Sequence, residues 1–160
     1  MMFQIRNAER KDCAIIGELI RAMAIYEKLA DKIIWDQKTL EYELFEEKNA
    51  YVLLGEEDGQ IIGFALYFFN FSTFVGRKGL YLEDLFIQEA FRKKGYGKQF
   101  FRHLAKIALD HHCGRMEWVC LDWNQPSIDF YIKKVHAQPM KDWTVYRLNE
   151  DQFENIITMD

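Results

Sequence analysis

The fold of this chain is decided by the stretch LFIQEAFRKKGYGKQF, which runs from Leu85 to Phe100. It opens with the apolar strand pattern Leu85-Phe86-Ile87 and leads through Arg92-Lys93-Lys94 into Gly95-Tyr96-Gly97-Lys98. From near Gly97, apolar residues recur at helical spacing, so we expect a helix to begin there. Glycines let backbone N–H groups turn toward a ligand, and a helix N-terminus adds positive potential. The stretch therefore predicts a phosphate-binding loop between a strand and a helix.

Two well-known phosphate loops do not fit this stretch. A dinucleotide fingerprint needs a third glycine where Phe100 stands, and a P-loop needs Ser or Thr where Gln99 stands. The spacing that fits is Arg-x-x-Gly-x-Gly from Arg92 to Gly97, which resembles the pyrophosphate-binding signature of the GNAT superfamily of acetyltransferases. This motif alone leaves open a simpler reading, a glycine-containing loop with basic solubilising residues.

Three further segments resemble the diamine acetyltransferases, the spermidine/spermine N1-acetyltransferase family. They are Tyr81–Asp84, Asp122–Tyr131 and Tyr26–Leu29, and the similarity extends over almost the whole chain. The resemblance implies an acetyl-CoA-dependent N-acetyltransferase that acts on a primary amine of a small diamine, polyamine or lysine-like substrate. Two alternatives stay open: acetylation of a protein lysine or N-terminus, and a non-catalytic coenzyme A-binding sensor module.

The order of elements predicts one mixed sheet. No linker, low-complexity tract or repeat interrupts residues 1–160, so we expect a single GNAT domain of the α/β (α+β mixed) class. We expect a mixed, mostly antiparallel sheet of about six or seven strands with helices on both faces. Helices are expected over 12–30 and 36–47, from about Gly97, and from about Pro126. The expected strands are Phe3–Arg6, Tyr51–Leu54, Ile61–Asn70, Leu80–Ile87, Met116–Leu121 and Thr144–Leu148.

Composition limits the class of protein. The net charge of −4 gives no electrostatic footprint for a nucleic acid. The longest apolar run, Ile61–Phe69, falls short of the ~20 residues that span a bilayer, so no membrane partner is expected. Cys13, Cys113 and Cys120 lack paired spacings, which favours reduced thiols in the cytoplasm. No metal is expected, although histidines lie at positions 103, 111 and 112, because no acidic ligand follows at suitable spacing.

Acetyl transfer to an amine needs a proton acceptor, because a free alkylammonium has a pKa near ~10.4. Glu83 is our candidate, acting directly or through a water, and the resemblance places a substrate-contacting glutamate at this position. Alternatively, Glu83-Asp84 solvates a strand end. A backbone N–H freed at a strand irregularity is expected to stabilise the thioester oxygen. The resemblance points to Leu85, Phe86 and Ile87 for this contact and for pairing with the pantetheine arm.

Tyr131 is the expected general acid, because in the family the tyrosine that ends Asn-x-Pro-Ser-x-x-x-Tyr protonates the departing thiolate. The alternative is a core aromatic residue with an incidentally satisfied hydroxyl group. By the same resemblance, Asn124, Pro126 and Ser127 contact coenzyme A, although Asn124 or Ser127 could also simply cap a helix.

The remaining expectations concern the amine and the assembly. The resemblance suggests Tyr26 and Glu27 as substrate contacts, with Glu117 and Trp118 bordering the same cleft; an ordinary helix end is the alternative for the first pair. It also implies a homodimer. His136 stands where such proteins usually have glycine, a turn position that histidine tolerates.

Overall fold

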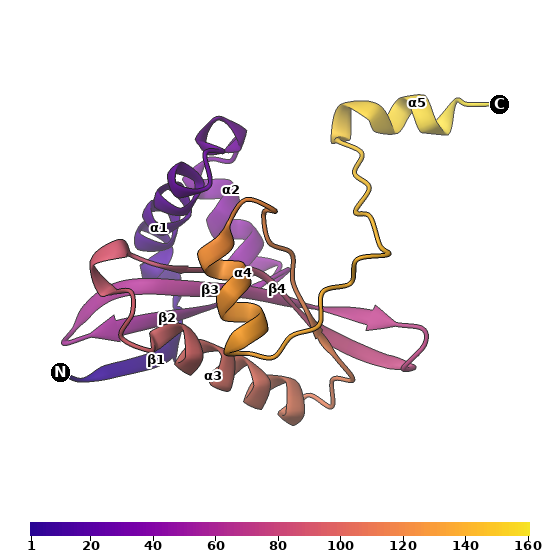
Figure 1. The fold of residues 1–160 in the computed structure, drawn as a ribbon. Helices are drawn as coiled ribbons and strands as arrows, with labels where there is room; N and C mark the ends of the chain where they lie inside the picture. The colour runs from indigo at the N-terminus through magenta and orange to yellow at the C-terminus, as the bar shows by residue number, and fades with distance from the viewer.

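Five strands form one sheet and lie side by side in the order in which they occur in the sequence (Figure 1). The computed structural model describes all 160 residues. The first four strands pair antiparallel, and β5 pairs parallel to β4, so the expected mixed sheet is confirmed. The strands are β1 (Phe3–Asn7), β2 (Tyr51–Glu57), β3 (Gln60–Ser72), β4 (Arg77–Ile87) and β5 (Met116–Glu117).

The hairpin between β2 and β3 is tighter than the sequence pattern indicates. The strands expected at Tyr51–Leu54 and Ile61–Asn70 leave residues 55 to 60 between them, whereas β2 continues to Glu57 and only Asp58-Gly59 forms the turn. Both turn residues have positive φ, 50° at Asp58 and 84° at Gly59. This is the Asp-Gly geometry of two-residue hairpins, whose twist matches that of the flanking strands.

Helices cover both faces of the sheet, as expected. On one face lie α1 (Cys13–Tyr26) and α2 (Gln37–Glu41), which continues into a π-helical turn at Tyr42–Glu46. On the other face lie α3 (Tyr96–Asp110) and α4 (Gln125–Lys133). No helix is long and apolar enough to cross a bilayer. The short 3-10 turns are Arg10–Asp12, Ala30–Lys32, Glu89–Phe91 and Glu150–Gln152.

Alternation along the strands divides the core into two layers. Val52 and Leu54 pack toward α1 with Ile16 and Leu19, whereas Leu53 between them packs toward α3 with Phe100. The side chains of Leu53, Leu54, Ile16 and Phe100 are fully buried. The sheet thus holds α1 and α3 on opposite sides of the same central strands.

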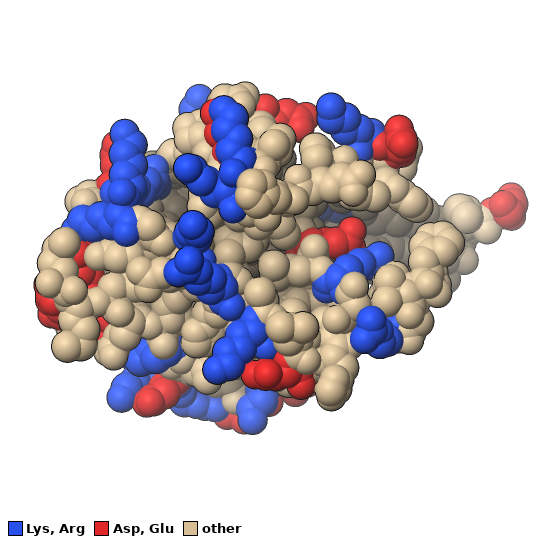
Figure 2. Space-filling model, turned by 60° about the horizontal axis from the view of Figure 1, so that its bottom comes forward, with Lys and Arg blue, Asp and Glu red and all other residues tan.

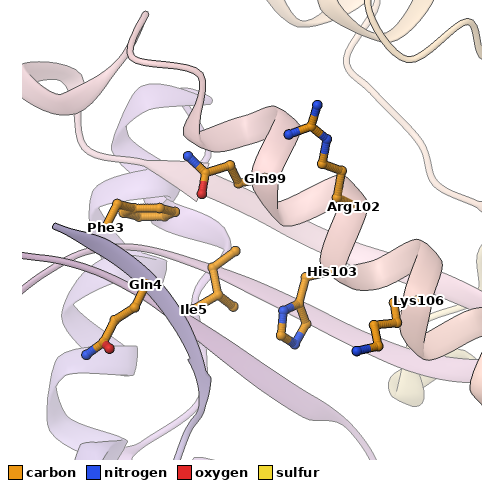
Figure 3. A pocket seen from close by; sticks show the side chains of 7 residues that line it. All are labelled: Phe3, Gln4, Ile5, Gln99, Arg102, His103 and Lys106. Carbon is orange, nitrogen blue, oxygen red and sulfur yellow. The ribbon is translucent and has the colours of Figure 1, made fainter.

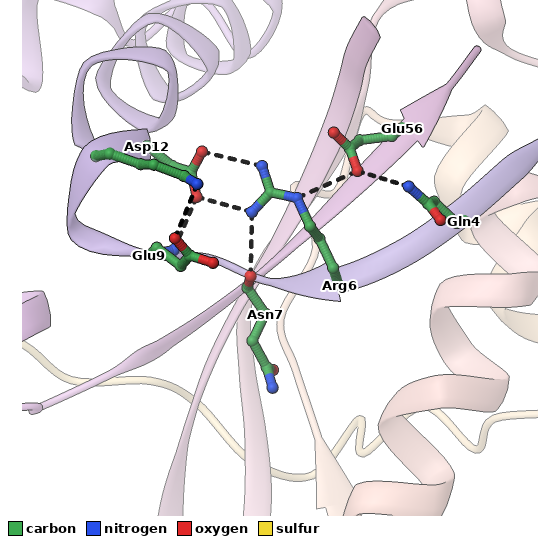
Figure 4. Close-up of polar contacts among 7 residues, drawn as sticks. Gln4, Arg6, Asn7, Glu9, Asp12 and Glu56 are labelled. Carbon is green, nitrogen blue, oxygen red and sulfur yellow. Dashed lines mark hydrogen bonds and ion pairs between the residues drawn. The ribbon is translucent and has the colours of Figure 1, made fainter. Parts of the chain in front are cut away.

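A charged network joins β1 to the start of α1 (Figure 4). The guanidinium group of Arg6 donates to both oxygens of Asp12, at 2.8 and 2.9 Å, and to Glu56 at 3.1 Å. Asp12 also accepts a bond from the backbone N–H of Glu9 at 2.7 Å. The Arg6 guanidinium holds the pKa of the Asp12 carboxyl below its usual range. This network fixes where α1 leaves the sheet.

The predicted count of six or seven strands is too high. β5 covers only two residues of the expected strand at 116–121, and Thr144–Leu148 forms no strand. All residues from Gln138 to Asp160 are exposed, and we call this segment the C-terminal arm. In Figure 1 it leads away from the sheet toward the short helix α5 (Phe153–Ile157). A strand needs a hydrogen-bonding partner, and the arm has none within the chain.

Candidate active site

The candidate site begins where β4 and β5 separate. The two strands pair only at Leu80 with Met116 and at Tyr81 with Glu117. From Leu82 to Ile87, β4 therefore has no strand partner on that side. Such an edge offers backbone donors and acceptors to an extended ligand. The residues predicted to meet a pantetheine arm, Leu85, Phe86 and Ile87, all lie on this edge.

A β-bulge interrupts β4 at the same place. Leu66 of β3 lies opposite Asp84, and the next residue, Tyr67, lies opposite Leu82, so Glu83 is an extra residue without a partner. The bulge reverses the alternation of side chains: Leu82 packs on the α3 side, whereas Asp84 lies opposite Leu66 of the α1-side core. Glu83 itself is exposed. The strand irregularity therefore lies at Glu83, two residues before the predicted Leu85.

Asp84 is the site residue that the sequence reasoning missed. Its carboxyl is largely buried, and burial followed by the neighbouring charges of Glu83 and Glu27 raises its pKa to about 7. Burial also raises the pKa of the Glu27 carboxyl. The only available signal in the sequence was the unusual Glu-Asp pair inside an apolar strand. The face of the sheet on which the Asp84 side chain lies could not be predicted, because it depends on the position of the bulge.

Tyr131 lies on α4 among aromatic rings. Its ring centroid is 5.3 Å from that of Trp118 and 5.9 Å from that of Phe101, so Trp118 contacts the predicted acid. Burial, followed by the charges of Cys120, Glu27, Tyr26 and Asp84, holds the pKa of the Tyr131 phenol well above its usual range. A phenol in this environment stays protonated and can donate a proton.

Tyr26 connects the helix that carries Glu27 to the start of α4. Its hydroxyl donates to Asn124 Oδ1 at 3.2 Å, and the same oxygen accepts the backbone N–H of Ser127 at 3.4 Å. Asn124 is therefore the N-cap residue of α4, with Pro126 in the first turn. The guanidinium carbon of Arg92 lies 4.5 Å from the centroid of the Tyr26 ring. Tyr26, a predicted substrate contact, therefore contacts Asn124 and Arg92, which are two of the predicted cofactor contacts.

The predicted phosphate loop leads into α3, which begins at Tyr96. Gly95 precedes it with φ of 85°, and Lys93 also has a positive φ of 64°. A Cβ atom at Gly95 would meet no atom within 4 Å, so the turn opens onto free space. At Gly97 a Cβ atom would lie 3.4 Å from the Phe130 ring, which is ordinary contact. The conformational need for glycine is therefore at position 95.

The basic side chains of the loop divide into two groups. Arg92 donates from Nε to the carbonyl oxygen of Ile87 at 2.8 Å, and Lys94 pairs with Glu57 at 2.9 Å. Lys93 and Lys98 are exposed and form no ion pair. Figure 2, which brings the α3 side forward, shows a band of Lys and Arg side chains across its middle. Phosphate groups at the start of α3 would meet this positive charge.

Glu117, a predicted substrate contact, lies opposite Tyr81 where β4 and β5 separate, and it forms an ion pair with Arg115 at 3.0 Å. A cavity of about 340 Å³ opens between β1 and α3, and Figure 3 shows Arg102, His103 and Lys106 along it. It contains none of the predicted site residues. No group of three His, Cys, Asp or Glu residues is placed to hold a metal ion.

His136, which stands where a glycine is expected, adopts a left-handed backbone conformation. His136 has φ of 59°, in the left-handed region, and the backbone N–H of Ala137 after it donates to the carbonyl oxygen of Tyr131 at 2.9 Å. Histidine thus holds the turn conformation that glycine would adopt more easily.

Comparison with known proteins agrees with this geometry. Residues 18–136 match the Acetyltransferase (GNAT) family. The chain is 33% identical over 164 residues to a thialysine N-epsilon-acetyltransferase of Bos taurus, with 95% of each protein covered. It is 31% identical over 160 residues to the spermidine/spermine N(1)-acetyltransferase-like protein 1 of Homo sapiens, covering 94% of this chain and 23% of that protein. Among solved structures, an integron cassette protein of V. cholerae superimposes with a TM-score of 0.80, 27% identity and 99% coverage of both chains.

Proposed function

Because the chain belongs to the acetyltransferase (GNAT) family and is an N-acetyltransferase, we propose that its acceptor is a primary amine of a small diamine, polyamine or lysine-like molecule. The resemblance to diamine acetyltransferases seen in the sequence is confirmed by the relatives. The observation that supports the acceptor class is the cluster of three acids Glu27, Glu83 and Asp84, in which the charges of Glu83 and Glu27 act on Asp84, while Glu27 and Asp84 act on the phenol of Tyr131. A partly buried cluster of acids favours a cationic amine.

The cofactor of this family is acetyl-CoA, which supplies the acetyl group as a thioester. The residues present fit its diphosphate: the N-terminus of α3 offers backbone N–H groups, and Gly95 opens onto free space beside them. Lys93 and Lys98 add unpaired positive charge. In this proposal the loop from Arg92 to Lys98 holds the diphosphate, the β4 edge at 85–87 pairs with the pantetheine amides, and the segment 124–127 borders the same cofactor.

In this proposal Glu83 accepts the proton of the attacking ammonium, directly or through a water. Its exposed position on the bulge supports the water route. Asp84 is a second candidate, because a carboxyl with a pKa of about 7 is matched to proton transfer at neutral pH. The backbone N–H groups at the bulge supply a hydrogen bond to the carbonyl oxygen as negative charge develops there.

Tyr131 donates the proton that the departing thiolate needs. Its raised pKa supports this role, because the phenol carries a proton throughout the working pH range. The aromatic cluster with Trp118 and Phe101 fixes the plane of the ring and excludes water from one side.

An amine panel assayed with acetyl-CoA tests this function. We expect thiol release with spermidine, thialysine, ornithine and short diamines, and weak turnover with lysine-containing peptides or peptide N-termini. Turnover confined to peptides would favour the protein-acetylating alternative. If coenzyme A bound in calorimetry but no amine gave turnover, the chain would be a coenzyme A sensor and the proposal would be wrong.

The proposal includes a homodimer in the cytoplasm. Large apolar side chains on the C-terminal arm support a second copy as partner, because isolated chains rarely expose so many in one segment. Val145 is 73% exposed, Tyr146 91% and Trp143 70%. The free thiols of Cys13, Cys113 and Cys120 are compatible with a reducing compartment.

A further inference from the structure

Glu57 is a buried carboxylate at the end of β2, with only 5% of its surface exposed. Its Oε1 accepts a hydrogen bond from the hydroxyl of Tyr96 at 2.7 Å and one from Lys94 Nζ at 2.9 Å. Its Oε2 accepts a second bond from Lys94 Nζ at 3.1 Å. A buried carboxylate needs such partners, because an unpaired charge out of water is strongly unfavourable. Both partners lie 37 or more residues away, in the predicted phosphate loop.

The two partners flank Gly95, the residue that turns the loop into α3. Lys94 precedes it and Tyr96 is the first residue of the helix. The Tyr96 ring is stacked on Phe3, with centroids 3.9 Å apart and planes 9° apart. Phe3 lies directly opposite Glu57 in the pairing of β1 with β2. The loop is therefore held on both sides of its glycine by β2, through Glu57, and Tyr96 is also held by β1, through Phe3.

We propose that Glu57 is a positioning residue for the cofactor: it holds Lys94 and Tyr96 so that the turn at Gly95 is formed before acetyl-CoA binds. The inference rests on the proposed role of the loop from Arg92 to Lys98. A loop that is already ordered does not lose conformational freedom on binding, which strengthens binding without any new contact. The Lys94 side chain is occupied by Glu57, so Lys93 and Lys98 carry the side-chain charge available to the diphosphate.

A purely electrostatic role and a positioning role of Glu57 make opposite predictions for the coenzyme A affinity of Glu57→Gln. Removing a carboxylate beside a diphosphate site adds net positive charge, so a purely electrostatic site would bind coenzyme A more tightly. Under positioning, the loss of the Lys94 bond frees the loop and binding becomes weaker. The salt bridge and the Tyr96 bond both hold the pKa of the Glu57 carboxyl below its usual range, so the carboxylate is ionised at neutral pH.

The test measures coenzyme A binding by calorimetry and initial rates with acetyl-CoA at saturating amine. For Glu57→Gln we expect the Kd of coenzyme A and the KM for acetyl-CoA to rise about tenfold, as for the loss of one charge-assisted contact, with kcat within about twofold. Lys94→Met should weaken binding similarly, and the double variant should be no weaker than either single variant. Asp58→Asn is the matched control, because it removes the neighbouring carboxylate, which does not bond to the loop; it should leave the Kd unchanged.

Other outcomes are decisive. Coenzyme A binding by folded Glu57→Gln that is equal to or tighter than wild type would overturn the positioning role while leaving the cofactor loop intact. A fall in kcat with unchanged KM would also overturn it. If wild-type protein bound no coenzyme A, the loop and this inference would fail together. Should Glu57→Gln not fold, Tyr96→Phe keeps the stacked ring and removes one bond; it should raise the Kd about threefold, and an unchanged Kd would contradict the proposal.

Discussion

Burial and acidic side chains from two separate segments act on the hydroxyl of Tyr131. Glu27 comes from the end of α1 and Asp84 from β4. Burial, followed by these groups, disfavours the phenolate, so the tyrosine is protonated at neutral pH. In the proposed reaction this proton is available to the thiolate that departs from the thioester.

Removing the Tyr131 hydroxyl should separate chemistry from binding. Tyr131→Phe keeps the ring in its aromatic cluster, so we expect kcat to fall about 10²- to 10⁴-fold while coenzyme A affinity stays within about twofold. Steady-state thiol release and calorimetry measure the two quantities. Tyr67→Phe, also a buried tyrosine of the α3-side core, is the control and should retain activity. Near-normal turnover by Tyr131→Phe would assign the proton to another donor.

Asp84 should make the protein less stable as pH rises. Its pKa is raised from 3.8 to about 7, so the folded state holds a proton that the unfolded state has released between these values. Ionisation of Asp84 therefore costs nothing below about pH 4 and destabilises the folded state increasingly up to about pH 7. Asp84→Asn removes this penalty, and we expect it to gain about 4 kcal/mol of unfolding free energy at pH 8 and almost none at pH 4.

Urea unfolding of wild type and Asp84→Asn at both pH values checks this expectation. Glu83→Gln is the matched control: it removes one neighbouring charge but not the buried group, so its gain should be smaller. An Asp84→Asn gain that was the same at pH 4 and pH 8 would contradict the raised pKa.

At the scale of elements, the bulge in β4 determines what the site contains. One extra residue, Glu83, moves Asp84 to the α1 side of the sheet and leaves backbone groups out of the ladder with β3. Deleting Glu83 would leave Leu82 and Asp84 in regular alternation opposite Tyr67 and Leu66. In this variant β4 would pair with β3 without interruption, and the residues after position 84 would keep their present partners on β3.

We expect the Glu83 deletion to fold and to bind coenzyme A but to lose activity. Its kcat should be about 10²-fold below that of Glu83→Ala, because the substitution removes only the side chain whereas the deletion also removes the free backbone donor. Circular dichroism, calorimetry and thiol release give the three measurements. Equal activity of the two variants would show that the bulge has no role beyond its side chain.

Local sequence patterns predicted most helices and strands and the phosphate loop. They did not predict features that depend on a contact with a residue far away in the sequence. The helical repeat located α1 and α3, and Arg92–Lys98 does join a strand to a helix. The helix expected over 36–47 begins at its first residue, where Asp36 Oδ1 accepts the backbone N–H of Thr39 as the N-cap of α2. The roles of Asp84 and Glu57 depend on a bulge register and on a contact 37 residues away, which no local pattern encodes. The segment Thr144–Leu148 contains the β-branched and aromatic residues that favour strands, but a strand forms only where its backbone finds a pairing partner.

At the scale of the whole molecule, the C-terminal arm should hold two copies together. Val145→Glu with Tyr146→Glu places charge on two highly exposed apolar positions, so we expect a dimer of the wild type to become a monomer at micromolar concentration. Sedimentation equilibrium measures the mass. Ile34→Glu is the control, because Ile34 is 96% exposed but lies outside the arm. A monomeric wild type would contradict the dimer.

The early end of the pairing between β4 and β5 also affects solvent exchange. From Leu82 to Ile87, backbone amides that point away from β3 have no strand to shield them. In deuterated water these amides should exchange faster than the amides of β2 and β3, which are paired on both sides. Any molecule that lies along this edge would slow that exchange, so isotope uptake at the amides that point away from β3 would report occupancy even with a compound that is never turned over.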